Sequence, residues 1–151
     1  MGLLKNIDIR NKWDSTFMEI ASLFAGHSSC IKRKVGAILV KDLRILSTGY
    51  NGTPVNFINC DEYFMNGGEL SHHDFHECYE IHAEQNCLAF AAKNGVSTKD
   101  CILYVTTAPC VNCAKLIIAS GIKEVIYKDI YKNDNGIKLL NIAGTKCRQI
   151  S

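Results

Sequence analysis

The chain alternates short apolar runs with segments of helical spacing, and this order restricts its fold more than any other feature. Two apolar runs at 35–40 and 45–50 enclose a short connector at 41–44, which is typical of an antiparallel hairpin. Helices are then expected from His82 to Asn94–Gly95, from Pro109 to Ile118 and over 136–143, and strands over 101–106, 125–127 and 146–150. Repetition of strand, helix and strand implies right-handed crossovers and helices on both faces of one sheet. We therefore predict an α/β fold in a single domain that spans residues 1–151.

Two further regions precede or interrupt this pattern. A first helix is expected to begin near Asp14 or Thr16 and to end at Gly26, because Thr16 and Glu19 have the spacing of a capping box. Residues 55–80 show neither the helical nor the strand period, and they contain several cysteines and histidines. A long irregular stretch inside a compact domain is usually functional, disordered or cross-linked. The cysteines and histidines favour the last of these.

Composition argues against several classes of protein. The net charge is only +2 and the basic residues form no stripe, so a nucleic-acid partner is not expected. The densest basic run, Lys32, Arg33 and Lys34, fits either a solvated turn or a contact with one phosphate group. No apolar run approaches the ~20 residues of a membrane helix and no secretory signal is recognisable, so we expect a cytoplasmic protein without a membrane partner. Eight cysteines in a reducing compartment indicate metal ligands or small buried hydrophobes rather than disulfides.

Two short motifs at the starts of successive expected helices carry the chemistry. His82-Ala83-Glu84 and Pro109-Cys110-Val111-Asn112-Cys113 together offer one imidazole and two thiolates. Three protein ligands leave a position on zinc for water, which is typical of a catalytic site, and helix starts stabilise thiolates. Glu84 lies two residues beyond His82 and can move protons without ligating the metal. A redox cysteine pair, a closed structural zinc site and a core histidine are the alternative interpretations of the separate parts.

With these motifs the sequence resembles the deoxycytidylate deaminases of the cytidine deaminase superfamily, from about Phe17 to about Ala143. Three further stretches carry the resemblance: Val35-Gly36-Ala37, Gly49-Tyr50-Asn51-Gly52-x-Pro54 and Tyr104-Val105-Thr106. The resemblance implies a three-layer α/β/α fold around a five-stranded mixed sheet. It also implies hydrolysis of dCMP to dUMP and ammonia, a reaction that feeds dTTP synthesis.

The same resemblance assigns roles to single residues. His82, Cys110 and Cys113 would bind the catalytic Zn²⁺, and Glu84 would be the proton shuttle. The implied substrate contacts are Asn51 on the 3′-hydroxyl of the deoxyribose, Ala83, Tyr131 as an aromatic that closes over the nucleotide, and Lys34 and Lys132 near the 5′-phosphate. For Tyr131, ordinary loop packing is an equal alternative.

Some members of the family carry a second, structural zinc. The residues at the matching positions are Cys30, Cys60, His72 and Glu80, and a carboxylate is an acceptable fourth ligand. Such a metal would hold the irregular segment without a core of its own. Other nearby ligands are alternatives, namely His73, His76 and Cys78, and so is a loop without metal. No role is expected for the remaining cysteines, Cys87, Cys101 and Cys147.

The resemblance also implies regulation and assembly. Family members are often homohexamers that dCTP with Mg²⁺ activates and dTTP inhibits, and the turn Gly52-Thr53-Pro54 resembles the loop that contacts the effector. A bare turn is the alternative for these three residues. Three other functions remain open at this stage: deamination of dCTP, alone or with dCMP; editing of nucleic acid; and a zinc module without catalysis. The low net charge argues against editing.

Overall fold

A mixed five-stranded sheet forms the centre of the molecule, as the resemblance implied. The computed structural model describes the backbone of residues 7–151 and the side chains of residues 12–151. The strands are β1 (Gly36–Lys41), β2 (Arg44–Tyr50), β3 (Ile102–Thr107), β4 (Glu124–Asp129) and β5 (Lys146–Gln149). They lie in the order β2-β1-β3-β4-β5, with β1 antiparallel to both of its neighbours and β3, β4 and β5 parallel. The predicted hairpin and the predicted final strand are both confirmed.

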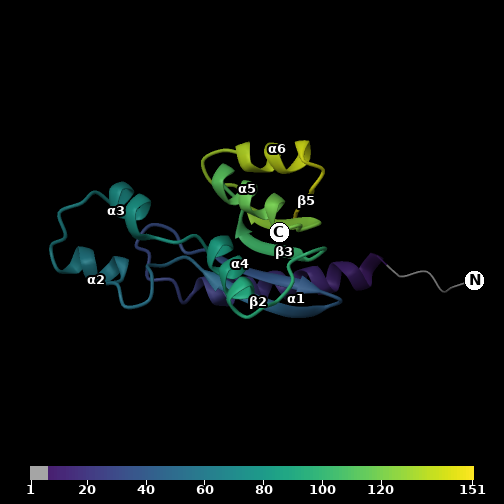
Figure 1. Ribbon diagram of the computed structural model, residues 1–151, viewed down its shortest axis with the longest axis horizontal. Helices are drawn as coiled ribbons and strands as arrows, with labels where there is room; N and C mark the ends of the chain where they lie inside the picture. Colours follow the sequence, from purple (N-terminus) through teal and green to yellow (C-terminus); the bar gives the residue numbers. More distant parts are fainter. Residues whose placement is uncertain (1–6) are drawn as a thin grey trace, which may run out of the picture.

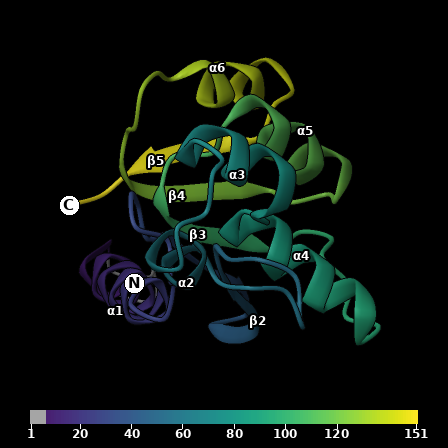
Figure 2. The ribbon, with the colours of Figure 1, turned by 90° about the vertical axis from the view of Figure 1, so that its left-hand side faces the viewer.

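Helices cover both faces of the sheet, so the predicted three-layer α/β/α fold is confirmed. The helices are α1 (Ile7–Ala25) on one face, and α4 (Ala83–Lys93), α5 (Val111–Ala119) and α6 (Asn135–Ile142) on the other (Figure 2). Side chains alternate across a strand, so Ile38 and Val40 of β1 pack against α1 while Ala37 and Leu39 face α4. The three cysteines expected to have no role, Cys87, Cys101 and Cys147, pack in or against the α4 layer.

The start of α1 differs from the prediction. The helix already includes Ile7, and the Thr16 hydroxyl donates to the carbonyl oxygen of Lys12 at 3.0 Å, so Thr16 lies inside the helix and does not cap it. A Thr hydroxyl often bonds back to the preceding turn in this way, which the capping-box spacing alone does not distinguish. The predicted end is confirmed, since α1 ends at Ala25, next to Gly26. None of the described helices has the length and apolar character needed to span a bilayer.

The expectation of an irregular segment at 55–80 is wrong. Two short helices, α2 (Cys60–Met65) and α3 (His72–Tyr79), lie beyond one end of the sheet (Figure 1). Ser71 caps α3 by accepting a hydrogen bond from the backbone N–H of Asp74 at 3.0 Å. The segment also has a small core around the fully buried Phe75, to which Cys30, Cys60, Tyr63, Phe64 and Leu70 contribute. The sequence did not predict these helices because each is too short to show a clear helical period and is stabilised by aromatic packing.

Because of the strand directions, several loops lie together at the end of the sheet that faces α2 and α3. The parallel strands β3 and β4 both end there, at Thr107 and Asp129. Because β1 is antiparallel to β3, and β2 to β1, the start of β1 and the end of β2 lie at the same end of the sheet. Four segments therefore meet: the residues before Gly36, the residues after Tyr50, the turn into α5 and the loop after β4.

A buried polar network connects α1 to the edge strand β5 and to its neighbour β4. Arg148 of β5 donates to Asp14 Oδ2 at 2.8 Å and to Glu124 Oε1 at 2.6 Å. The hydroxyl of Tyr104 donates to Asp14 Oδ1 at 2.6 Å, and burial together with this acidic neighbour raises the pKa of Tyr104. The carboxylates of Asp14 and Glu124 are only 6% and 5% exposed, so their charges depend on the guanidinium of Arg148.

We expect Arg148→Met to lower the free energy of unfolding by about 3 kcal/mol, because it removes the cation from two buried carboxylates. Urea denaturation followed by circular dichroism would measure the loss. Lys138→Met is the matched control: it removes the cation of the exposed Lys138–Asp134 pair (3.2 Å) and should cost at most about 0.5 kcal/mol. Equal effects of the two substitutions would contradict this account of the network.

Candidate active site

His82 is held at the start of α4 by contacts on both sides. It is the N-cap residue, with an extended backbone, and its backbone N–H donates to Oε1 of Gln85 at 2.8 Å. Gly49 of β2 allows the strand to pack directly on this helix start, since a β-carbon at that position would lie 2.5 Å from the carbonyl oxygen of Ala83. The backbone of residue 82 is therefore fixed between β2 and α4.

Cys110 and Cys113 lie at the start of α5. Cys110 is its N-cap residue, and Cys113 lies three positions further, which on a helix places the two sulfurs on the same side. Gly136 of α6 contacts the turn directly, because a β-carbon there would overlap the carbonyl oxygen of Pro109. Close packing of α6 thus sets the position of the Pro109–Cys110 turn.

The side chains of these three residues converge. His82 Nδ1 lies 3.2 Å from Cys113 Sγ and 3.6 Å from Cys110 Sγ, and all three ligand atoms lie within 4.8 Å of one another. Among the described residues, no fourth ligand belongs to this group. One imidazole nitrogen and two sulfurs match the preferences of zinc, and three ligands leave a position open on a tetrahedral ion. The donor set therefore fits a catalytic zinc.

Charge within this cluster is distributed so that it suits a cation. Hydrogen bonds from Cys113 and His82 lower the pKa of the Cys110 thiol to about 3. The bond that Cys113 gives to Cys110, together with burial, raises the pKa of Cys113. The hydrogen bond to Cys110 raises the pKa of His82, although burial opposes it. The sulfur of Cys110 thus carries negative charge at neutral pH, as a metal-binding cysteine requires, while Cys113 keeps its proton in the absence of a bound cation.

Glu84 lies in the first turn of α4 and is 4% exposed. Burial raises the pKa of its carboxyl group, while the neighbouring His82 and Cys113 act in the opposite direction. A carboxyl group with a raised pKa beside a metal site can hold and release a proton near neutral pH, which general acid–base catalysis requires.

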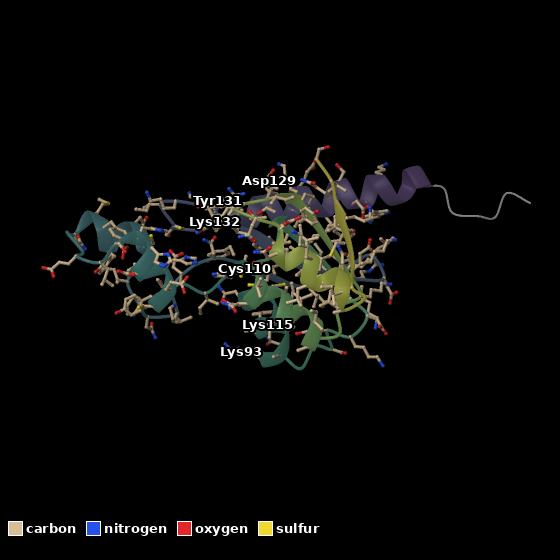
Figure 3. The ribbon with its side chains drawn as sticks, turned by 90° about the horizontal axis from the view of Figure 1, so that it is seen from above. Lys93, Cys110, Lys115, Asp129, Tyr131 and Lys132 are labelled. Carbon is tan, nitrogen blue, oxygen red and sulfur yellow. The ribbon has the colours of Figure 1, made fainter. Side chains whose placement is uncertain are left out.

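A cavity of about 780 Å³ opens above these residues. His82, Ala83, Glu84 and Cys110 line it from the helix starts, and Asn51, Arg33, Tyr131 and Lys132 line it from the surrounding loops. Figure 3 shows Cys110, Tyr131 and Lys132 at the end of the sheet that faces α2 and α3. The cavity is large enough for a ligand of nucleotide size.

Of the two cations that the resemblance assigned to the 5′-phosphate, Lys132 lines the cavity and Lys34 does not. From the segment around Lys34, the cavity is lined by Lys32, Arg33 and Val35. The carboxamide of Asn51 explains the orientation of this segment: it accepts from the backbone N–H of Val35 at 2.8 Å and donates to the carbonyl oxygen of Arg33 at 2.9 Å. Sequence reasoning missed Arg33. The available signal is the basic run at 32–34, which predicts either a solvated turn or a phosphate contact and does not single out Arg33.

Arg33 packs with the loop that follows β4. Its Nε donates to Thr107 Oγ1 at 3.1 Å, and its guanidinium carbon lies 4.5 Å from the centre of the Tyr131 ring. Lys132 Nζ lies 5.3 Å from the same ring centre, so two cations flank one aromatic side chain. Lys132 has a positive φ of 67°, a conformation that is rare for residues other than glycine and is often found at functional sites.

The turn at Gly52-Thr53-Pro54 lies beside a smaller cavity of about 260 Å³, which Gly52 and Thr53 line and Pro54 does not. Gly52 also pairs with Ile81: its N–H donates to the Ile81 oxygen at 3.1 Å, and the Ile81 N–H donates back at 2.8 Å. The turn is therefore connected to the residue before His82.

The four residues assigned by resemblance to a second metal come together. Cys30, Cys60, His72 and Glu80 each offer a ligand atom within 4.8 Å of the others, and Cys30 Sγ lies 3.4 Å from His72 Nε2. Burial raises the pKa of the Cys60 thiol to about 12 and lowers that of His72. Of the alternative ligands, His73 and Cys78 are exposed on α3, and His76 lies between this group and His82.

Comparisons with known proteins agree with this geometry. Residues 11–129 match the family described as the cytidine and deoxycytidylate deaminase zinc-binding region. The deoxycytidylate deaminase of Saccharomyces cerevisiae is 40% identical over 95% of this chain and 46% of its own length, and that of Enterobacteria phage T2 is 37% identical over 81% and 83%. The dCMP deaminase of cyanophage S-TIM5, solved with dCMP and dUMP, has a TM-score of 0.80 and 34% identity over 97% of this chain and all of its own. The chain spans about half the length of the yeast relative.

We expect the purified protein to bind two equivalents of Zn²⁺, because it has two separate sets of ligand atoms, and within each set all atoms lie within 4.8 Å of one another. Cys113→Ala should retain one equivalent and Cys60→Ala the other, as measured by atomic absorption after dialysis. Wild-type protein with a single equivalent, lost in Cys113→Ala and kept in Cys60→Ala, would contradict the second set.

Proposed function

Because the chain belongs to the cytidine and deoxycytidylate deaminase family, we propose that it hydrolyses dCMP to dUMP and ammonia. The observation that supports this most directly is the three-ligand cluster with a buried carboxyl group beside it and a cavity above both. Removal of the 4-amino group of a cytosine needs a nucleophile and a proton carrier at one ring face, and these residues offer both.

The proposed roles follow from position. His82, Cys110 and Cys113 hold zinc, which when bound supplies a hydroxide nucleophile at neutral pH. Glu84 would take the proton released as the nucleophile forms and pass it to the ring nitrogen. It would then take the proton of the new 4-hydroxyl group and give it to the 4-amino group, which leaves as ammonia while the C4 carbonyl forms. Its burial keeps water away from this transfer and raises the pKa of the carboxyl group towards the working range. Ala83, buried between two functional residues, presents backbone to the base.

Substrate choice is proposed to depend on the mouth of the cavity. Arg33 and Lys132 flank Tyr131 there, and two cations close together favour a phosphate group over an uncharged nucleoside. Asn51 would contact the 3′-hydroxyl with the hydrogen-bonding capacity that its two backbone contacts leave free. The same cations could accept a triphosphate, so dCTP is the alternative substrate that an assay has to compare.

The proposal extends to regulation. Cys30, Cys60, His72 and Glu80 would hold a structural zinc under α2 and α3, next to the smaller cavity lined by Gly52 and Thr53. By similarity to the family, dCTP with Mg²⁺ would activate and dTTP inhibit from this loop, in a homohexamer. Product dUMP would enter the synthesis of dTTP.

Glu84→Gln should lower the turnover of dCMP by at least about 100-fold and leave both zinc ions in place, because the amide keeps the shape of the side chain but cannot carry the proton. Ammonia release and zinc content would be measured on the same sample. Glu62→Gln, on the exposed surface of α2, is the matched control and should turn over dCMP at the wild-type rate. A non-catalytic zinc module would show no ammonia release from either variant or from the wild type.

Arg33→Ala should raise the KM for dCMP about tenfold and leave the much weaker reaction with deoxycytidine unchanged, because only the nucleotide carries the phosphate. Lys93→Ala at the far end of α4, labelled in Figure 3, controls for loss of one positive charge. Assays with dCMP, dCTP and deoxycytidine would be run side by side. A wild-type preference for deoxycytidine would contradict the phosphate contact.

A further inference from the structure

His76 of α3 lies between the two groups of metal ligands and contacts both. Its Nε2 is 3.0 Å from Nε2 of His82, and its Nδ1 is 2.9 Å from Oε2 of Glu80. His82 belongs to the first group and Glu80 to the second. One imidazole ring thus spans the two groups.

The backbone around Ile81 creates this arrangement. Ile81 is paired with Gly52 by two hydrogen bonds, and the residues on either side of it have extended backbones, with ψ of 132° at Glu80 and 155° at His82. In an extended segment, side chains two residues apart point to the same side. His76 of α3 precedes the C-cap residue Glu80 by four positions, and its ring contacts the side chains of both Glu80 and His82.

The protons on these nitrogens follow from the geometry. The nitrogen of His82 that faces the two sulfurs is Nδ1, so a metal held there leaves the proton of the neutral ring on Nε2. His82 Nε2 then donates to His76 Nε2, which has to accept. The proton of a neutral His76 is consequently on Nδ1, which donates to Glu80 Oε2. Each hydrogen bond in this chain has one direction.

Glu80 completes the connection. Its side chain is fully buried, and among the described side chains its second oxygen, Oε1, has no hydrogen-bond partner. Burial would raise the pKa of this carboxyl group, but the hydrogen bond from His76 and the nearby Cys60 outweigh burial and lower it. Glu80 therefore has one oxygen committed to His76 and one available to the ligands Cys30, Cys60 and His72.

We propose that His76 is a positioning residue that holds His82 in its metal-binding tautomer and couples the first group of ligands to the second through Glu80. The inference rests on the zinc sites of the proposed function. A metal-bound histidine usually donates its other N–H to a partner that fixes its orientation, and loss of that partner weakens metal binding about 10- to 100-fold. Here the partner is itself oriented by a ligand of the second group, so metal binding at either group strengthens binding at the other.

Zinc release to a chromogenic chelator tests the positioning role. Cys113→Ala, which keeps only the second zinc, identifies the phase that belongs to each group. His76→Phe retains a ring but neither hydrogen bond, and should release the zinc of the His82 group about 10- to 100-fold faster. His76→Gln keeps an acceptor near the position of Nε2 and should restore slow release in part, whereas His76→Asn, which keeps only the donor towards Glu80, should not.

His73→Phe is the matched control, because His73 is exposed on the same helix, and it should release zinc at the wild-type rate. A purely packing role of His76 predicts that the Phe variant behaves like this control. Wild-type release from His76→Phe would therefore overturn the proposal.

The coupling is tested by emptying the second group with Cys30→Ser. In the wild-type background this substitution should accelerate zinc release from the His82 group, and in the His76→Phe background it should have no further effect. Rate factors that multiply in the double variant would show that the two groups are independent, and would overturn the coupling.

A measurement without any substitution guards against variants that fail to fold. Long-range ¹H–¹⁵N correlation spectra of the zinc-loaded protein should show His82 protonated on Nε2 and His76 on Nδ1. A proton on Nε2 of His76 would overturn the proposal. Zinc release and tautomers are read without substrate, so a protein that binds zinc as described but does not deaminate dCMP would refute the proposed function alone.

Discussion

Three donor atoms from two helix starts have to enter one coordination sphere, and the strand directions of the sheet make this possible. The starts of α4 and α5 lie at the same edge because β3 leads directly into the Pro109–Cys110 turn, while β2 packs on α4 through Gly49. The antiparallel placement of β1 brings Arg33 to that edge as well. One topology thus places the candidate metal ligands, the proposed proton carrier and the cations of the cavity together. They lie at the carboxyl ends of strands, where open α/β sheets commonly bind ligands.

Buried carboxylates in this molecule are of two kinds, and the difference separates stability from chemistry. Asp14 and Glu124 both pair with Arg148, and neither lines the cavity. Glu80 and Glu84 are equally buried but have histidine and cysteine as their neighbours. Carboxylates that face metal ligands rather than Arg or Lys keep a capacity to bind a cation or exchange a proton. Such perturbed groups beside a cavity are typical of functional sites.

The convergence of His82, Cys110 and Cys113 was predictable from the sequence because the spacing within each motif is short and local. His82 and Glu84 share one helix start, and Cys110 and Cys113 share another, so each pair is set by helix geometry alone. The four residues of the second group are spread from Cys30 to Glu80, and their assignment needed the resemblance to a family, since no local period joins them.

The helices α2 and α3 were not predicted because each is short and is stabilised by aromatic contacts around Phe75. Arg33 was not recognised because its orientation depends on the long-range hydrogen bonds of Asn51. The contact between His76 and His82 was not predicted for the same reason. It depends on the long-range backbone hydrogen bonds between Ile81 and Gly52, which the sequence does not reveal.

The contact between Gly136 and Pro109 has a consequence for the order in which the molecule is built during synthesis. All four ligands of the second group leave the ribosome before Cys110, so that group can close while the first still consists of His82 alone. The turn that carries Cys110 is fixed only after α6 has emerged and Gly136 has docked on it. During synthesis, the chain therefore contains all four residues of the second group before it contains all three of the first, and the Cys110 turn reaches its final position only when α6 docks.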